Sequence, residues 1–346
     1  MRIAQVAPLA ESVPPKLYGG TERVVSWLTE DLVALRHEVT LFASGDSVTN
    51  AHLVPVWPRS LRMSKPRGDP IIAVTTMLEA VARRAADFDV IHVHIDWLHV
   101  PLLRRLRTPF VTTLHGRLDL PGLSELLRDF PDAALISISH DQRTSLPAVK
   151  WAGTIYHGMP PTLLQPRRER EGYLAFLGRL APEKGADRAI RIARRVNIPL
   201  RIAAKLPREA SQYYKDKIQP ELDGRLVQFI GEVRDEDKEE FLGNAAAMLF
   251  PIDWPEPFGL VMIEAMACGT PVIAFRRGSV PEVIEDNVSG LIVEDEAGAI
   301  IAVGRIQDLD RDRVRDAFER RFTTRRMTED YLTVYQRLIE TGAQRP

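Results

Sequence analysis

Short apolar segments alternate with helical patterns along nearly the whole chain. Between the first two such segments, Val24, Leu28, Leu32 and Leu35 follow the spacing of a helix with one buried face. Near-continuous apolar strands that are separated by amphipathic helices predict a parallel sheet covered on both faces. We expect strands at 2–8, 38–44, 90–94, 110–115, 134–139 and 154–158, and then at 173–178, 200–205, 227–232, 247–252, 271–275 and 290–293.

The alternation is interrupted at 159–171, where three prolines and a run of charged residues show no periodicity. With 346 residues, the chain is long enough for two ordinary domains. We therefore expect an α/β protein with two doubly wound, Rossmann-like domains at 1–160 and 161–322. The segment 323–346 is predicted to form a helix that packs back on the first domain. Ligands of open α/β sheets bind beyond the carboxyl ends of the strands, so functional residues are expected there.

Composition excludes several classes of function. With 46 basic and 47 acidic residues, the chain has no overall attraction for nucleic acid or an anionic membrane. The sole cysteine, Cys268, excludes an intrachain disulfide and a Cys-based zinc site, and we expect it to be a small buried hydrophobic residue. The N-terminal residues lead into a strand, and no apolar run approaches the ~20 residues that span a bilayer. These features predict a cytoplasmic protein without a transmembrane segment.

The segment 254–275 is the first candidate site. A loop follows a predicted strand, and a helix is expected to begin near Gly259 and to end at Gly269. The free N–H groups and partial positive charge at such a helix start suit a phosphate. Glu264 lies within the apolar helix and needs a polar partner, either a ribose diol of a ligand or a neighbouring backbone group. Glu256 could reach the hydroxyls of a sugar beyond the phosphates.

Two further segments follow predicted strands. Arg179 and Lys184 in the segment 178–185 place two cations where an anion would bind, although such residues are also common in solvated loops. Gly19 and Gly20 open the first predicted helix. A glycine pair there allows the backbone to approach a ligand, but it also fits an ordinary turn.

Together, Gly19 and Gly20, the sequence TLHG at 113–116, GRLAPEKG at 178–185 and the Glu256-x7-Glu264 block resemble glycosyltransferase family 4. The resemblance covers nearly the whole chain. It implies the GT-B architecture, with an acceptor-side N-terminal domain and a C-terminal domain that binds a nucleotide sugar. It further implies retaining transfer of a hexose-type sugar from a UDP-, GDP- or ADP-sugar to a hydroxyl of a sugar, lipid or small molecule. Neither a metal nor a cofactor is implied.

The resemblance also assigns roles to individual residues. Arg179 and Lys184 would hold the donor pyrophosphate, Glu264 the ribose, and Glu256 the transferred sugar, while His115 would lie beside the donor sugar. The implied catalytic set is His115, Glu256, Arg179 and Lys184. The implied donor-binding set is Gly19, Gly20, Arg179, Lys184, Lys205, Glu256, Phe258, Gly259, Leu260, Val261 and Glu264.

The chain departs from the family pattern after the second strand of the predicted donor domain. Many members have a glycine-containing loop there, whereas this chain has AAKLP at 203–207. Lys205 could therefore supply an additional phosphate-binding cation, or it could be a surface residue at the end of a strand.

Other functions are compatible with parts of the sequence. His92, His94 and Asp96 have the spacing that puts side chains on one face of an extended strand, as in some zinc hydrolases. That hypothesis leaves Arg179 and Lys184 without a role. A sugar-nucleotide epimerase of the same architecture, or a non-catalytic nucleotide-sugar binder, would share the phosphate site. The Asp-x-Asp strings at 87–89, 235–237 and 308–312 are interpreted as solvated surface.

Overall fold

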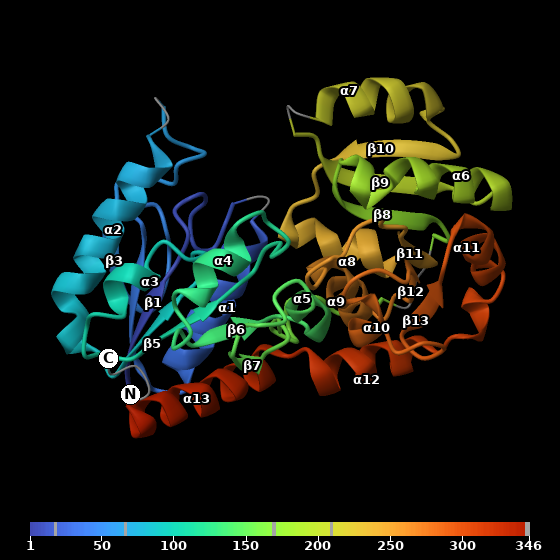
Figure 1. The fold of residues 1–346 in the computed structure, drawn as a ribbon. Helices are drawn as coiled ribbons and strands as arrows, with labels where there is room; N and C mark the ends of the chain where they lie inside the picture. The colour runs from blue at the N-terminus through green and yellow to red at the C-terminus, as the bar shows by residue number, and fades with distance from the viewer. Residues whose placement is uncertain (17–18, 66–67, 168–170, 208–209, 343–346) are drawn as a thin grey trace. The chain divides into compact units, whose positions relative to one another are not determined.

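A computed structural model describes residues 1–346 apart from 17–18, 66–67, 168–170, 208–209 and 343–346. Contacts between Cα atoms divide the chain into two compact units. The first comprises Met1–Met159 with Thr324–Pro346, and the second comprises Pro160–Thr323. Each unit contains a parallel sheet with helices packed against it, which confirms the predicted α/β class with two doubly wound sheets (Figure 1).

In the first unit, the described residues form a seven-stranded parallel sheet in the order β3-β2-β1-β4-β5-β6-β7. The strand order turns back on itself at β1 and β4, as in doubly wound folds. The strands are β1 (Arg2–Val6), β2 (Glu38–Ser44), β3 (His52–Trp57), β4 (Val90–Val93), β5 (Phe110–Thr113), β6 (Leu135–Ser137) and β7 (Trp151–Thr154).

Helices cover this sheet through their apolar faces. In α1 the buried residues include Val24, Leu28 and Leu32, as the periodicity predicts. The C-terminal helix α13 packs on α1 and β4, and its Tyr331 and Tyr335 are fully buried. The helices of this unit are α1 (Gly20–Ala34), α2 (Pro70–Arg84), α3 (Val100–Leu103), α4 (Leu123–Arg128), α5 (His140–Arg143) and α13 (Thr324–Thr341), with a 3-10 turn η1 (Ala85–Asp87).

In the second unit, the described strands form a six-stranded parallel sheet in the order β10-β9-β8-β11-β12-β13. These strands are β8 (Leu174–Arg179), β9 (Leu200–Lys205), β10 (Val227–Gly231), β11 (Ala247–Phe250), β12 (Val272–Phe275) and β13 (Gly290–Val293). The helical segments are η2 (Pro182–Lys184), α6 (Ala186–Val196), α7 (Ser211–Tyr213), η4 (Tyr214–Ile218), η5 (Gln219–Glu221), α8 (Asp235–Gly243), α9 (Leu260–Ala267), α10 (Val280–Val283), α11 (Glu296–Val303), η6 (Ile306–Asp308) and α12 (Arg311–Arg321).

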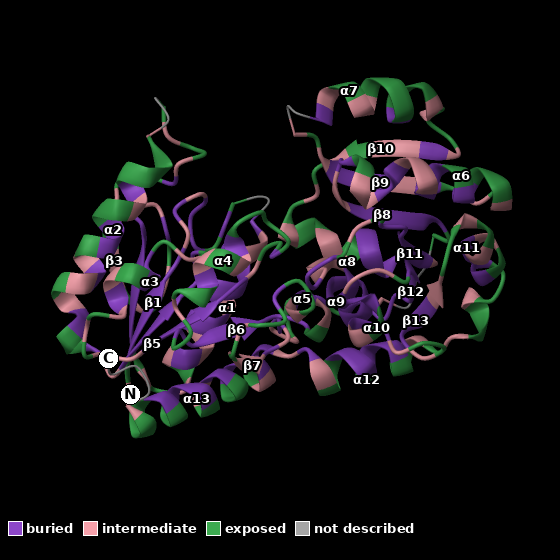
Figure 2. Cartoon of the chain, in the orientation of Figure 1, coloured by how far each residue is buried: buried purple, intermediate pink, exposed green. Residues whose placement is uncertain are grey.

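Many of the buried residues lie on the central strands of the two sheets. In Figure 2, strands β1, β4 and β5 of the first unit and β8, β11 and β12 of the second are largely buried, whereas the outward faces of the helices are exposed. Within the described parts of the chain, no helix combines the length and the apolar character needed to cross a membrane.

Two predictions of secondary structure were wrong. The strand expected at 154–158 lies earlier, at Trp151–Thr154, and β3 was not expected at all. As an edge strand that contains Pro55 and is largely exposed or half-buried, β3 lacks the continuous apolar run of an interior strand. The strands expected at 38–44, 200–205 and 290–293 have the predicted bounds.

Candidate functional site

Cations lie at the carboxyl ends of two neighbouring strands in the second unit. Arg179 is the last residue of β8, and it is in register with Lys205, the last residue of β9. Arg179 donates to Glu183 Oε1 across 3.0 Å. The sheet thus brings together two of the predicted cations, which are separated by a whole strand–helix unit in the sequence.

The loop that follows β8 carries Lys184 and packs against the loop that follows β11. At Gly185, φ is +76°, and a Cβ atom there would lie 2.2 Å from the carbonyl oxygen of Pro251. A glycine at this position is therefore required by both the backbone conformation and the close approach of the two loops. The Asp253 amide also donates to the Glu183 carbonyl across 2.8 Å.

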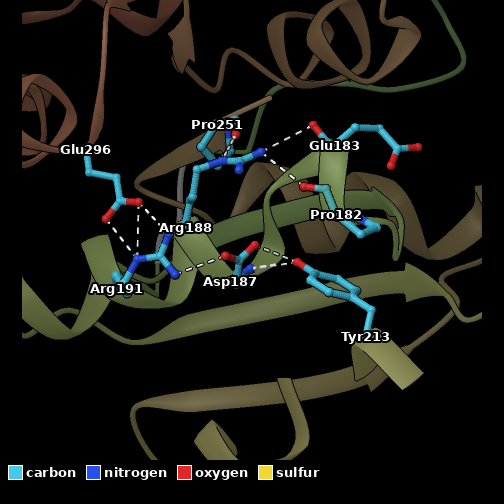
Figure 3. Close-up of polar contacts among 8 residues, drawn as sticks. All are labelled: Pro182, Glu183, Asp187, Arg188, Arg191, Tyr213, Pro251 and Glu296. Atoms are coloured by element: carbon cyan, nitrogen blue, oxygen red, sulfur yellow. Dashed lines mark hydrogen bonds and ion pairs between the residues drawn. The ribbon is translucent and has the colours of Figure 1, made fainter. Parts of the chain in front are cut away.

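Arg188, on the first turn of α6, fixes the spacing of these two loops (Figure 3). Its Nε donates to the Pro251 carbonyl across 2.7 Å, and its Nη2 donates to the Pro182 carbonyl across 3.1 Å. One guanidinium thus holds the segment that carries Lys184 and the segment that leads to Glu256. No pattern of residues indicates this role, because the partners of Arg188 are backbone carbonyls.

The other contacts in Figure 3 anchor α6 itself. Arg191 pairs with Asp187 at 2.9 Å and with Glu296 at 2.5 Å. Asp187 in turn accepts from the Tyr213 hydroxyl at 2.6 Å, and burial together with this bond raises the pKa of Tyr213.

Lys184 and Glu256 form a largely buried ion pair, although they are 72 residues apart in the sequence. Trp254 Nε1 donates to the same carboxylate oxygen of Glu256 across 2.8 Å, and Lys184 Nζ lies 4.5 Å from the centroid of the Trp254 ring. Gly278, at φ +56°, allows the chain to pass behind Glu256, since a Cβ there would lie 2.3 Å from the Glu256 amide nitrogen. Trp254 was not among the predicted site residues, although its place two residues before Glu256 was a usable signal.

Helix α9 begins where the sequence predicted it. Gly259 is the N-cap residue at φ +79°, and Leu260 and Val261, the first two helical residues, are half-buried. Phe258 differs from its neighbours, because its side chain is buried and its ring packs edge-on against Phe322 at 5.9 Å between centroids. A ligand can therefore contact the backbone of Phe258 but not its buried side chain.

Glu264 is 3% exposed and pairs with Lys238 of α8, whose Nζ lies 2.6 Å from Glu264 Oε1. Lys238 also contacts Asp235 at 3.1 Å. The partner predicted for Glu264 was a ribose diol or a backbone group, and Lys238 was not predicted. Lys238 lies in the acidic segment DEDKEEFLG, which resembles a solvated helix face.

The remaining predicted residues, Gly19, Gly20 and His115, belong to the first unit. Gly19 is buried and Gly20 is the first residue of α1. A Cβ at Gly19 would lie 2.7 Å from Pro15 Cβ, so close packing alone favours glycine there. His115 follows the end of β5 by two residues, at the carboxyl edge of the first sheet.

His115 is half-buried and belongs to a cluster with three buried histidines, His92, His94 and His157. Its Nε2 lies 3.0 Å from His94 Nδ1, and its ring stacks on that of His157. Burial lowers the pKa of His115 to about 3 and the pKa values of His92 and His94 well below their ordinary values. These rings are therefore neutral at physiological pH.

The cluster does not have the arrangement of the zinc site that the sequence left open. His92 uses both ring nitrogens, with the Tyr335 hydroxyl at 2.6 Å and the Thr113 hydroxyl at 2.8 Å, while Asp96 is exposed. In the described part of the chain, no group of three or more His, Cys, Asp or Glu side chains is placed to hold a metal ion.

Comparisons with known proteins agree on one class of enzyme. Residues 165–321 match the family "Glycosyl transferases group 1", and residues 18–179 match "Glycosyltransferase Family 4". The N-acetyl-alpha-D-glucosaminyl L-malate synthase of Bacillus anthracis is 27% identical over 311 residues, which cover 76% of this chain and 78% of that protein. AviGT4, a glycosyltransferase involved in avilamycin A biosynthesis, has a TM-score of 0.74 and 26% identity, with 98% of each chain covered. Anabaena HepE, solved with UDP and glucose, has a TM-score of 0.71 and 19% identity over 98% of this chain and 100% of that one.

Proposed function

This chain belongs to the family 4 glycosyltransferases of the GT-B type, and we propose that it transfers a hexose-type sugar from a nucleotide diphosphate donor to a hydroxyl acceptor, with retention of configuration and without a metal ion. The observation that carries this proposal is the contact of Lys184 with Glu256, beside the paired strand ends of Arg179 and Lys205. Three cations, Arg179, Lys184 and Lys205, then lie with the Glu256 carboxylate at the carboxyl edge of one sheet.

The second unit supplies the donor site in this proposal. A pyrophosphate carries charge that Arg179 and Lys184 neutralise, with Lys205 as a third cation. The N–H groups at the start of α9 add partial positive charge. Gly259 precedes them without a side chain, so a phosphate can approach these N–H groups closely. Glu264 binds the ribose hydroxyls while Lys238 compensates its buried charge.

The ion pair between Lys184 and Glu256 gives both residues a partner that a donor can replace. When a pyrophosphate takes Lys184, the Glu256 carboxylate becomes available to accept hydrogen bonds from the sugar hydroxyls. Trp254 holds that carboxylate in place through Nε1. The exchange couples recognition of the phosphate to recognition of the sugar.

The chemical step breaks the bond between the anomeric carbon and the phosphate oxygen, and the electron pair remains on the phosphate. Arg179, Lys184 and the start of α9 stabilise the charge that develops there, which takes the place of a metal clamp. The acceptor hydroxyl attacks the anomeric carbon from the face that the phosphate leaves. Its oxygen forms the new glycosidic bond, and its proton passes to the departing phosphate oxygen.

The first unit is the acceptor-side domain in this proposal, and it contributes Gly20 and His115. The ring of His115 is neutral, so its part in this proposal is hydrogen bonding and not the supply of a positive charge. The C-terminal helix α13 completes this unit by packing on α1 and β4.

The decisive experiment measures nucleotide release from UDP-, GDP- and ADP-sugars in excess EDTA, with and without an acceptor. L-malate is the first acceptor to try, because the Bacillus anthracis relative is named for it. Release from one donor that EDTA leaves unchanged, and that Lys184→Ala abolishes, supports the proposal. Loss of activity in EDTA contradicts metal independence. Interconversion of sugar nucleotides without any transfer would instead identify an epimerase.

A further inference from the structure

The N-terminal half of helix α2 is apolar on both of its faces. Its inner face packs on the first unit through the buried side chains of Ala73 and Met77. Its outer face carries Ile71 and Ile72, which are 69% and 60% exposed. A helix at the surface of a globular protein ordinarily turns charged and polar side chains to solvent. An apolar outer face of this kind marks a surface that binds a partner.

Two threonines extend the outer face of α2 by one turn. Thr75 Oγ1 donates to the Ile71 carbonyl across 2.7 Å, and Thr76 Oγ1 donates to the Ile72 carbonyl across 2.9 Å. The helix backbone thus satisfies both hydroxyls, so covering these side chains costs little desolvation energy. A groove lies along this face and is lined by both isoleucines and both threonines. Figure 2 shows the exposed residues along α2.

The connection from β3 to α2 adds a further exposed apolar side chain. A Cβ atom at Gly68 would lie 3.4 Å from Leu61 Cδ2, so the end of this connection folds back on its beginning. Met63 lies two residues after Leu61 and is 53% exposed. Because Gly68 lies two residues before α2, this fold brings Met63 toward the start of the helix. The Leu61 amide donates to the Leu9 carbonyl across 2.9 Å, which fixes the connection at the carboxyl edge of the first sheet.

The same connection carries positive charge. Arg59 and Lys65 are exposed, and the structure shows no ion pair for either of them among the described residues, whereas Arg62 is paired with Glu11 at 2.9 Å. Asp69 is the only acidic residue between positions 59 and 76. Its carboxylate accepts from backbone N–H groups at the start of α2, whose partial positive charge compensates it. Since the whole chain has a net charge of −1, attraction for an anionic surface comes from these local cations.

We propose that Met63, Ile71 and Ile72, together with the cations Arg59 and Lys65, bind the surface of a lipid bilayer that contains anionic lipid; we call these five residues the α2 surface. The apolar side chains enter the headgroup region, and the cations meet the lipid phosphates. A fluid bilayer accepts both kinds of side chain without a complementary shape. Binding to vesicles needs no nucleotide sugar, so this inference stands apart from the proposed function.

A second copy of the chain fits the α2 surface less well than a bilayer does. Three exposed apolar side chains cover much less than the about 800 Å² per partner that a stable interface buries. Two copies related by a twofold axis would also bring the same unpaired cations toward one another. Anionic lipid, in contrast, complements those cations.

Cosedimentation of the full-length protein with lipid vesicles tests the proposal. One set of vesicles contains phosphatidylcholine alone, and the other contains equal parts of phosphatidylcholine and phosphatidylglycerol. We expect the protein to bind the mixed vesicles at low salt and to be released as salt is added, because salt screens the attraction between cations and phosphates. We expect little binding to phosphatidylcholine alone. Absence of binding to the mixed vesicles at low salt overturns the proposal.

Matched variants locate the binding surface. Ile71→Ser/Ile72→Ser should lower the partition coefficient for the mixed vesicles about tenfold or more. Ile301→Ser removes an isoleucine that is also 69% exposed, from α11 of the second unit, and it should leave binding unchanged. Lys65→Gln should lower the coefficient about fivefold, whereas Lys215→Gln in η4 should not change it. All these side chains are exposed, so each variant should have the urea midpoint of the parent.

Three results would overturn this assignment. Equal binding by Ile71→Ser/Ile72→Ser and the parent would remove α2 from the contact, and an equal loss in Ile301→Ser would mean unspecific adhesion. Equal binding of the parent to both kinds of vesicle would remove the role of the cations. Sedimentation velocity without lipid detects the alternative occupant. A dimer of the parent that Ile71→Ser/Ile72→Ser dissociates would assign the α2 surface to self-association instead of a bilayer.

Discussion

Lys238 Nζ lies 2.6 Å from Glu264 Oε1 inside the second unit, and the two side chains are only 11% and 4% exposed. The pair joins α8 to the middle of α9, the most apolar helix of the candidate site. A buried carboxylate with a fixed cationic partner can accept further hydrogen bonds from a ligand without bringing an uncompensated charge into the core. The lysine thus explains how the protein tolerates Glu264 at this position.

Breaking this pair from the lysine side should be costly. Lys238→Met leaves the Glu264 carboxylate buried without its cation, and we expect the free energy of unfolding to fall by about 3–5 kcal/mol. Urea denaturation followed by circular dichroism measures the change. The double variant Lys238→Met/Glu264→Gln should recover part of the loss, while the exposed control Lys215→Met should change little. Equal stability of Lys238→Met and the parent would contradict the role of the pair.

Lys184→Ala tests the phosphate site. If Lys184 stabilises the developing charge on the leaving phosphate, kcat/KM for the donor should fall about 100-fold or more, with the protein still folded. Steady-state nucleotide release gives this value. Lys215→Ala, which removes an exposed lysine from η4, should leave the rate unchanged. Similar rates for the two variants would remove Lys184 from the proposed site.

Arg188→Met tests the hydrogen bonds by which Arg188 joins the loop that carries Lys184 to the loop that leads to Glu256. Loss of the guanidinium leaves the carbonyl oxygens of Pro182 and Pro251 without their donor. We expect a loss of about 1–3 kcal/mol in unfolding free energy and a rise in the donor KM. Arg191→Met on the same helix removes pairs of a half-exposed side chain, and each such pair contributes about 1 kcal/mol or less. The donor KM of Arg191→Met should remain that of the parent. An equal rise in the donor KM of both variants would contradict a specific role of Arg188 in joining the two loops.

Stability should fall as the solution becomes acidic, because burial lowers the pKa of several histidines. For His99 and His115, burial lowers the pKa from 6.5 to about 3, so the unfolded chain binds more protons between these values. The stability contributed by each neutral ring is therefore fully present above about pH 6.5 and is lost as the pH falls toward about 3, by up to about 1.4 kcal/mol per pH unit. Urea denaturation between about pH 7 and about pH 5 measures the slope. His99→Asn should reduce the slope of unfolding free energy against pH by the equivalent of about one bound proton. An unchanged slope would show that the lowered pKa of His99 does not contribute to it.

Cys268 should be chemically inert in the folded protein. Burial raises the pKa of its thiol to about 12, and the thiolate is the reactive form. Iodoacetamide at mildly alkaline pH should therefore leave the native chain unlabelled and modify it only after denaturation in urea, as mass spectrometry would show. Rapid labelling of the native chain would mean that the segment around α9 opens readily.

Much of the fold was readable because its signals are local. Interior strands such as β2 and β9 are short apolar runs between helical patterns, and the start of α9 at Gly259 follows from the loop before it. The edge strand β3 was missed because its half-exposed residues form no such run. The strand ends also identified Arg179, Lys184 and Glu256 as candidates.

The partners of those residues could not be read from the sequence. Lys184 meets Glu256 because the sheet order places β8 beside β11, and Lys238 meets Glu264 because α8 packs on α9. The histidine cluster likewise needs β1, β4 and α13 to converge on Gln5. Hydrophobic periodicity specifies which segments are strands and helices, because the period of a strand or a helix is visible within a few neighbouring residues. Contacts between side chains depend on strand order and register over long separations, so only the tertiary structure decided which charges and ring nitrogens are paired.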